Sequence, residues 1–246
     1  MPDTKRSSSV EGVAGDGRKA HSETLSDNIT NLPLVSRVAS TLRDMIAQDK
    51  LKPGMRIRER QLSEKLEVSR TPLREAIRIL VSEKLVESLP NRGAVVAEPD
   101  PNRVRELLQV LGAMEAFGGR LATENASADE ISEIRALHFE MLAAYHRKDK
   151  LGYFKLNQMI HKSIIAASGN EVLIETHAQL NARVYRIRYI SNQRNEMWHE
   201  AIEEHERIVD ALEARDGALL EILLASHLGQ TWVKARDVNR VAGVRA

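Results

Sequence analysis

The spacing of apolar residues predicts three short helices in the first third of the chain. From Leu34 onward, apolar side chains recur every three or four positions, as in a helix that buries one face, until the Lys-Pro-Gly at residues 52–54. The same period returns over residues 58–68 and 71–85, with only a tight turn between them. We therefore expect a closely joined pair of helices behind a first amphipathic helix.

The following segment has the alternation of two short strands. Residues 85–89 and 94–97 flank the turn sequence Pro-Asn-Arg-Gly, a combination typical of a β-hairpin. Three helices followed by a hairpin form the layout of a winged helix-turn-helix, in which the second helix of the close pair enters the major groove of DNA. We place this domain at residues 31–98.

Helical spacing returns after residue 98 and continues to residue 238, with no strand alternation and no internal repeat. Breaks occur near residues 124–128, 148–151, 168–170, 192–195 and 215–217. This pattern predicts an all-α antiparallel bundle of six or seven helices, so the expected fold class is mainly α. Residues 1–30, rich in serine, glycine and charge, are expected to be a disordered tail, and residues 239–246 a frayed end.

Composition and charge narrow the class of protein. The 246 residues contain 36 Lys+Arg and 35 Asp+Glu, a net charge of +1, so a basic surface must be local. Residues 31–98 hold 13 basic and 9 acidic side chains, which places the basic excess in the predicted winged helix domain. The absence of cysteine excludes disulfides, thiolate metal sites and cysteine nucleophiles. No apolar run is long enough to span a bilayer, so we expect a cytoplasmic protein without a membrane partner.

The third predicted helix begins with a concentration of positive charge. Three arginines follow one another on one of its faces at intervals of four: Arg70, Arg74 and Arg78. A helix N-terminus normally favours acidic side chains, and Ser69 or Thr71 is placed to cap this one. DNA phosphate would neutralise both the helix end and the arginines, and a bidentate arginine contact to guanine would select a base. The alternative is a solvated arginine face, partly balanced by Glu75.

Three histidines of the predicted bundle lie beside apolar stripes: His161, His205 and His227. Asn157 shares a helix face with His161, four positions later. Neutral imidazoles that converge inside a bundle suit a divalent metal, zinc above all, with nickel, iron or manganese as alternatives. Spacing alone favours hydrogen-bonded histidines at the core boundary, because no His-x-x-x-His pair occurs. The other histidines of the bundle are expected at exposed or boundary positions without a role: His138, His146, His177 and His199.

The sequence RERQLSEKLEVSRTPLREAIRILVSEKLV, followed by NRGAVVA, resembles the DNA-binding domain of the GntR family of bacterial transcription regulators. The resemblance covers residues 34–98 and implies that four side chains of the two helices contact DNA: Arg60, Arg70, Thr71 and Arg74. It also implies that Gly93 lets the backbone of the wing approach the minor groove, and that Ser69 caps the helix or binds phosphate. One departure is Glu67, an acidic residue near the expected phosphate path where the family often has glycine.

Residues 101–236, which include FKLNQMIHKSIIAASGN and the two later histidines, are similar to the FCD ligand-binding domain of the FadR-type subfamily. In many members an Asp and three His bind zinc, nickel or a similar ion, and a small organic acid completes the coordination. The resemblance assigns His161, His205 and His227 to the three histidines and Asn157 to the Asp position. Asparagine contributes an oxygen without negative charge, so a carboxylate effector would supply the missing anion.

A second departure from the FCD pattern is Leu111, where the family frequently has an arginine that recognises an acid. A later helix carries three arginines: Arg183, Arg186 and Arg188. We expect one of them to face the cavity and two to face solvent. Arg183 is the candidate that we assign to effector binding.

These features predict a ligand-responsive transcription regulator and not an enzyme. A homodimer would present two winged helices to a two-fold-symmetric double-stranded operator, and a small carboxylic acid in the helical domain would change their spacing. Two alternatives remain open at this point. One is a dimeric DNA-binding protein without an effector, and the other is a metal-dependent enzyme, for which no general base is apparent.

Overall fold

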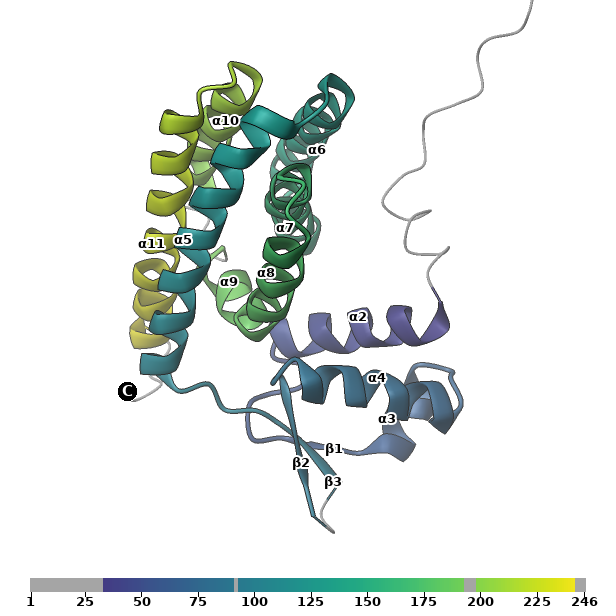
Figure 1. Cartoon of the computed structure of the whole chain (residues 1–246). Coiled ribbons are helices and arrows are strands. Elements are labelled where there is room, and N and C mark those ends of the chain that lie inside the picture. Colours follow the sequence, from purple (N-terminus) through teal and green to yellow (C-terminus); the bar gives the residue numbers. More distant parts are fainter. Residues whose placement is uncertain (1–32, 91–92, 193–197, 242–246) are drawn as a thin grey trace, which may run out of the picture. The chain divides into compact units, whose positions relative to one another are not determined.

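The computed structural model describes residues 33–90, 93–192 and 198–241 (Figure 1). The tail expected at residues 1–30 lies outside them. The described residues from Leu34 onward form one compact unit, in which a winged helix domain precedes a helical domain. The expected fold class, mainly α with a small β-sheet, is confirmed.

Three helices build the winged helix domain: α2 (Leu34–Ala47), α3 (Glu59–Lys65) and α4 (Arg70–Ser82). Their apolar stripes meet in one core, where Leu42, Leu73 and Leu80 are completely buried. Leu62 of α3 closes the same core. Because the apolar face of α4 is held in this way, its arginine face is turned outward.

The sheet of this domain has three antiparallel strands in the order β1-β3-β2. The predicted hairpin is formed by β2 (Val86–Leu89) and β3 (Gly93–Val96). The additional strand β1 (Arg56–Ile57) pairs with the outer edge of β3. The sequence did not predict β1 because two residues are too few to show alternation.

Seven helices of the helical domain lie within the described residues: α5 (Pro101–Asn125), α6 (Ala128–His146), α7 (Lys150–Ala167), α8 (Glu171–Arg183), α9 (Tyr185–Ser191), α10 (Trp198–Glu213) and α11 (Gly217–Val241). The breaks before α6, α7 and α8 coincide with side chains that cap the next helix: Ser127, Asp149 and Asn170. The break at Val184 between α8 and α9 was not predicted, because no glycine, proline or capping residue marks it.

The end of α11 differs from the prediction. The helix continues to Val241, three residues beyond the end of the bundle expected at residue 238, since no glycine or proline interrupts the chain before Gly243. Residues 242–246 lie outside the described part. None of the helices in the described ranges is long and apolar enough to cross a membrane.

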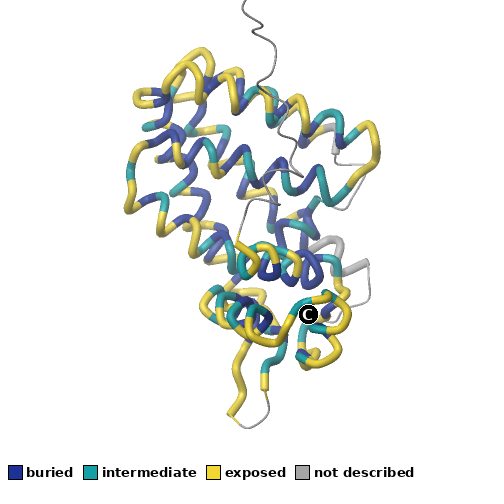
Figure 2. The backbone as a smooth tube through the Cα atoms, turned by 90° about the vertical axis from the view of Figure 1, so that its right-hand side faces the viewer, coloured by how far each residue is buried: buried dark blue, intermediate teal, exposed yellow. Residues whose placement is uncertain are grey.

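Helices α5 and α11 lie side by side along the bundle (Figure 1). A Cβ atom at Gly119 of α5 would collide with the side chain of Leu224 of α11, so glycine permits this close approach. Figure 2 shows that buried positions follow the inward faces of the helices, while their outward faces are exposed. The bundle core therefore has the amphipathic arrangement that the spacing predicted.

Helix α2 also contacts the helical domain. The carboxylate of Asp44, which is 9% exposed, accepts a hydrogen bond from the hydroxyl of Tyr185 (2.9 Å) and pairs with the ammonium of Lys155 (2.6 Å). Arg186 of α9 pairs with Asp49, just beyond α2 (2.8 Å). The contacts of Asp44 are partly shielded from water, so they fix α2 against α7 and α9 more firmly than surface ion pairs would, whereas the Arg186–Asp49 pair is exposed.

Candidate DNA-binding surface and metal centre

Helix α4 presents the predicted DNA-contacting residues to solvent. Arg70, Thr71 and Arg74 are all exposed in the first turns of the helix, and Ser69 is its N-terminal flanking residue. The hydroxyl of Ser69 makes no capping hydrogen bond, so it is available to an outside acceptor or donor. The helix end and its arginines thus form one positively charged surface.

The arginines of this surface are held only by exposed carboxylates. Arg74 pairs with Glu59 of α3 at 2.8 Å, and Arg60 pairs with Glu64 at 3.1 Å. Exposed pairs of this kind contribute roughly 0–1 kcal/mol, so a phosphate can replace either carboxylate at small cost. Arg70 has no ion-pair partner in the described chain, and Glu75 pairs with Arg78 and not with Arg70.

The wing adds a second basic element. Gly93 begins β3 with a φ of +80°, a conformation that glycine adopts without strain. The guanidinium of Arg56 lies beside it, 3.9 Å from where a Cβ of residue 93 would be. No sequence pattern marks Arg56, because its strand β1 is only two residues long. The wing tip, residues 91–92, lies outside the described ranges.

Glu67 occupies a backbone position that favours glycine, the residue that the resemblance to the family implied here. Its φ is +53°, in the left-handed region, because the chain reverses between α3 and α4 at this residue. A side chain other than glycine costs roughly 1–2 kcal/mol in this conformation. The exposed carboxylate also adds a negative charge two residues before the cap of α4.

We predict that Glu67→Gly stabilises the protein by about 0.5–1 kcal/mol, since relief of strain outweighs the greater chain entropy of glycine. It should also tighten DNA binding a few-fold. Urea unfolding and DNA titration measure the two effects. Glu67→Gln separates them, because it removes the charge and keeps the strain. A Glu67→Gly variant less stable than the parent would contradict the assignment.

Three of the predicted metal ligands come together inside the helical domain. One nitrogen from each of His161 on α7, His205 on α10 and His227 on α11 lies within 4.8 Å of the other two. His161 and His205 are buried, at 1% and 0% exposure, and His227 is half-buried. The bundle thus brings together imidazoles from three helices that are far apart in sequence.

The Nδ1 atoms of the three histidines face oxygen atoms. His205 donates from Nδ1 to the carbonyl of Ala201 (2.6 Å), and His227 donates from Nδ1 to Glu204 (2.7 Å). The Nδ1 atom of His161 lies 2.7 Å from Glu115 Oε2, but the angle between them is not that of a hydrogen bond. Carbonyl and carboxylate oxygens only accept, so these contacts leave the three Nε2 atoms as lone-pair donors.

His161 is incompletely satisfied in this arrangement. Neither of its buried ring nitrogens has a hydrogen-bond partner. A buried polar atom without a partner costs roughly 1–3 kcal/mol, and such atoms in native proteins require an explanation. A cation bound at Nε2 would supply the missing partner, so the residues present fit a metal ion.

Asn157, the fourth predicted ligand, contacts the same cluster. Its amide nitrogen donates to Nε2 of His205 at 2.8 Å. Rotation of the amide by half a turn would direct its oxygen to the same place, where it would serve as a neutral ligand. The structure therefore brings together all four residues that the sequence analysis assigned to the metal site.

A buried polar network supports the cluster. Arg188 of α9, which is 3% exposed, donates from Nη1 to Glu115 (3.0 Å) and to the side-chain oxygen of Asn181 (2.9 Å). Glu115 also accepts a hydrogen bond from His177 at 3.1 Å. Asn181 in turn donates to Gln158, the neighbour of Asn157 (3.1 Å). Side chains of α5, α7, α8 and α9 are thus linked by hydrogen bonds beside the histidine cluster.

Burial and neighbouring charges set the protonation of these groups. Burial lowers the pKa of His161 to about 4, although the carboxylate of Glu115 opposes the shift. Burial, together with repulsion from His227 and His161, places the pKa of His205 well below its usual range. Burial by itself raises the pKa of Glu115, but His161 and Arg188 hold it well below its usual range. Near neutral pH the two imidazoles are uncharged and able to bind a cation, and Glu115 is ionised.

Two histidines differ from the prediction of exposed or boundary positions. His138 is 0% exposed and His177 is 1% exposed, because both occupy the inner faces of their helices. His146 is exposed as predicted, and the side chain of His199 lies outside the described part. The sequence analysis gave Glu115 no role in the site, though its place within the apolar stripe of α5 was a signal that it is buried.

The three arginines of the later helices have separate places. Arg188 is the one that lies against Glu115, beside the histidine cluster. Arg186 pairs with Asp49, and Arg183 lines a different pocket, near Pro99. One inward arginine was expected, and it is Arg188; the effector role assigned to Arg183 stays a prediction. Leu111, at the position where the family often has arginine, is completely buried among apolar side chains.

Comparison with known proteins agrees with this architecture. The model for bacterial regulatory proteins of the gntR family matches residues 34–96, and the FCD domain model matches residues 106–230. The "Probable D-xylose utilization operon transcriptional repressor" of Paenarthrobacter nicotinovorans is 31% identical over 195 residues, 78% of this chain and 85% of that protein. The transcriptional repressor RspR of Escherichia coli is 25% identical over 208 residues, 85% of this chain and 91% of that protein.

A solved structure shares the fold. Escherichia coli McbR/YncC superposes with a TM-score of 0.71 at 24% identity, over 84% of this chain and 98% of that chain. A winged helix with an exposed arginine face, joined to an all-helical domain, is the architecture of a DNA-binding transcription regulator, and the families and relatives that match are transcription regulators and not enzymes. The chain belongs to the GntR family of bacterial regulators and carries an FCD domain.

Proposed function

We propose that this regulator binds a divalent metal, with zinc as the first candidate, through His161, His205, His227 and the amide oxygen of Asn157. The observation that carries the proposal is the buried ring of His161, whose two nitrogens lack hydrogen-bond partners within a cluster of three imidazoles. Neutral imidazoles are ligands for zinc, nickel, iron and manganese. The ion would act as a Lewis acid that binds an anionic effector, with no chemical turnover.

The effector in this proposal is a small carboxylic acid. Three imidazoles and one amide leave a bound dication without any anionic ligand, so a carboxylate would complete the site. Arg188 supports this assignment. Both hydrogen bonds of the Arg188 side chain come from Nη1. Neither Nε nor Nη2 has a partner in the described part of the chain. The second carboxylate oxygen of the acid would accept hydrogen bonds from Nε and Nη2 of Arg188.

The proposal includes a homodimer that presents two winged helices to a two-fold-symmetric operator in the cytoplasm. Its support is an apolar seam on the outer face of α5 with the spacing of a coiled coil: Val110, Met114, Phe117 and Leu121. Val110 is 49% exposed and Phe117 is 40% exposed. A second copy of the same seam would cover these side chains.

We predict that Phe117→Glu dissociates the dimer, raising its dissociation constant about 100-fold or more, because an unpaired charge would be buried at the seam. Sedimentation or light scattering measures the change. Phe139 of α6, which is 59% exposed and lies off the seam, gives the matched control Phe139→Glu. The seam is the wrong surface if Phe117→Glu remains a dimer or if Phe139→Glu dissociates.

The experiment that tests the proposed function combines metal content with DNA binding. Protein purified without chelator should contain about one metal ion per chain and should retard DNA from its own promoter region at low salt. Addition of an effective carboxylic acid should change that affinity, and removal of the metal should abolish the response to the acid. An unchanged response in metal-free protein would show that acid and metal act separately.

A further inference from the structure

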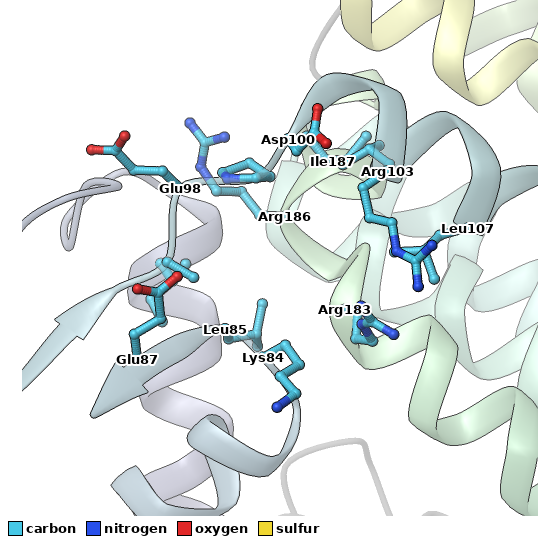
Figure 3. Close-up of a pocket in the computed structure, with 14 residues that line it drawn as sticks. Lys84, Leu85, Glu87, Glu98, Asp100, Arg103, Leu107, Arg183, Arg186 and Ile187 are labelled. Atoms are coloured by element: carbon cyan, nitrogen blue, oxygen red, sulfur yellow. The ribbon is translucent and has the colours of Figure 1, made fainter. Parts of the chain in front are cut away.

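A pocket of about 240 Å³ lies where the chain passes from the winged helix domain into α5 (Figure 3). Lys84 and Leu85 line it from the winged helix domain, and Val104 and Leu107 line it from the start of α5. Ile187 of α9 adds to the apolar wall. The histidine cluster does not contribute to this pocket, so the two sites are separate.

An arginine without a partner faces this pocket. The buried Nε of Arg183 has no hydrogen-bond partner, and Arg183 forms no ion pair with any described residue. Figure 3 shows the side chains of Arg103 and Arg183 extending toward the same space. Lys84 of the lining also has no ion pair in the described chain, whereas Arg103 pairs with Glu106. An unsatisfied guanidinium in a pocket is a recognition site for an anion.

The acidic residues of the lining do not neutralise these cations. The carboxylate of Asp100 caps α5 by accepting a hydrogen bond from the backbone of Asn102 (3.0 Å). That of Glu98 lies against Gly54, and Figure 3 shows it pointing away from the pocket. Arg186 is already paired with Asp49. Arg103 pairs with Glu106 of the same helix at 3.0 Å, but both side chains are exposed, so a ligand carboxylate can replace Glu106 at small cost. The lining as a whole holds four basic and three acidic side chains, an excess of one positive charge.

We propose that this pocket binds a small carboxylic acid with a short aliphatic chain, at a second ligand site independent of the metal. The carboxylate accepts hydrogen bonds from Arg183 and Arg103, and the aliphatic part packs against Leu85, Val104 and Leu107. The proposal rests on the established DNA-binding class and not on the proposed metal. Because the ligand touches both domains, its binding is linked to their relative placement and hence to operator affinity.

The test uses hexanoate as the probe, with calorimetric titration of the full-length protein. Arg183→Gln should weaken hexanoate binding about tenfold or more, because it removes a charge-assisted hydrogen bond. Arg105, an exposed arginine of α5 outside the lining, gives the matched control Arg105→Gln, which should bind like the parent. His161→Ala should retain the hexanoate site that Arg183→Gln weakens, which separates this site from the metal site. Thermal unfolding of each variant checks that the fold is retained.

Three results would overturn the proposal. The first is a failure of hexanoate to bind the parent protein. The second is loss of binding in His161→Ala with retention in Arg183→Gln, which would place the acid at the histidine cluster. The third is inorganic phosphate binding as tightly as hexanoate, since the apolar wall would then contribute nothing and the site would be one for a bare anion.

Discussion

Alanine at both Arg70 and Arg74 is expected to weaken binding of operator DNA by about 100-fold or more. Each arginine contact to a phosphate or a guanine is worth roughly 1–3 kcal/mol, and α4 carries both side chains exposed in its first turns. The dependence of affinity on salt should also become less steep, because fewer counterions are released. Fluorescence anisotropy of labelled DNA over a series of salt concentrations measures both quantities.

The control for this double substitution carries alanine at Arg105 and Arg147, two exposed arginines of the helical domain. It lowers the net charge by the same amount and leaves α4 intact. Equal loss of affinity in the two variants would mean that overall charge and not the α4 surface binds DNA. The burial of Leu73 and Leu80 predicts that the Arg70 and Arg74 variant remains folded.

The second large effect concerns the metal site. His205→Ala is expected to lower the affinity for zinc about 100-fold or more, because removal of one imidazole leaves two strong ligands and a neutral amide. Calorimetric titration of metal-free protein with zinc measures the loss. His146→Ala is the matched control, since His146 is an exposed histidine outside the cluster. Similar zinc affinity in His205→Ala and the parent protein would contradict the assignment.

Asn157→Asp gives the opposite prediction at the same site. A carboxylate in place of the amide adds a negative charge beside the ion and should tighten zinc binding about tenfold or more. The same substitution should weaken the response to an acid effector, because the protein then supplies the anion itself. Parallel titrations with zinc and with the acid measure the two changes, and an unchanged zinc affinity would exclude residue 157 as a ligand.

Local patterns predicted much of the fold. Features that act over a few residues can be recognised in the sequence. Examples are the arginine spacing of α4, the Pro-Asn-Arg-Gly turn and the capping residues Ser127, Asp149 and Asn170. The division of α8 from α9 at Val184 has no such feature. Val184 is completely buried, and the helix is interrupted there because tertiary packing outweighs the helical propensity of the chain.

The candidate metal site could be predicted only in part. His161, His205 and His227 were singled out by their place beside apolar stripes, but only the resemblance to a family assigned them as ligands, since their separations in sequence show no ligand motif. Glu115, His177 and Arg188 come from three further helices, and their association depends on how those helices pack. A single charged residue in an apolar stripe, such as Glu115, indicates burial but not its partner. The partners of Glu115 become apparent only from the packing of α5, α8 and α9 in the structure.

The most direct measurement is anomalous X-ray diffraction from crystals of the protein as purified, recorded at the absorption edges of zinc and nickel. We predict one anomalous peak among the Nε2 atoms of His161, His205 and His227, with the amide oxygen of Asn157 turned toward it. A cluster without an anomalous peak, both as purified and after the crystals are soaked in zinc, would contradict it.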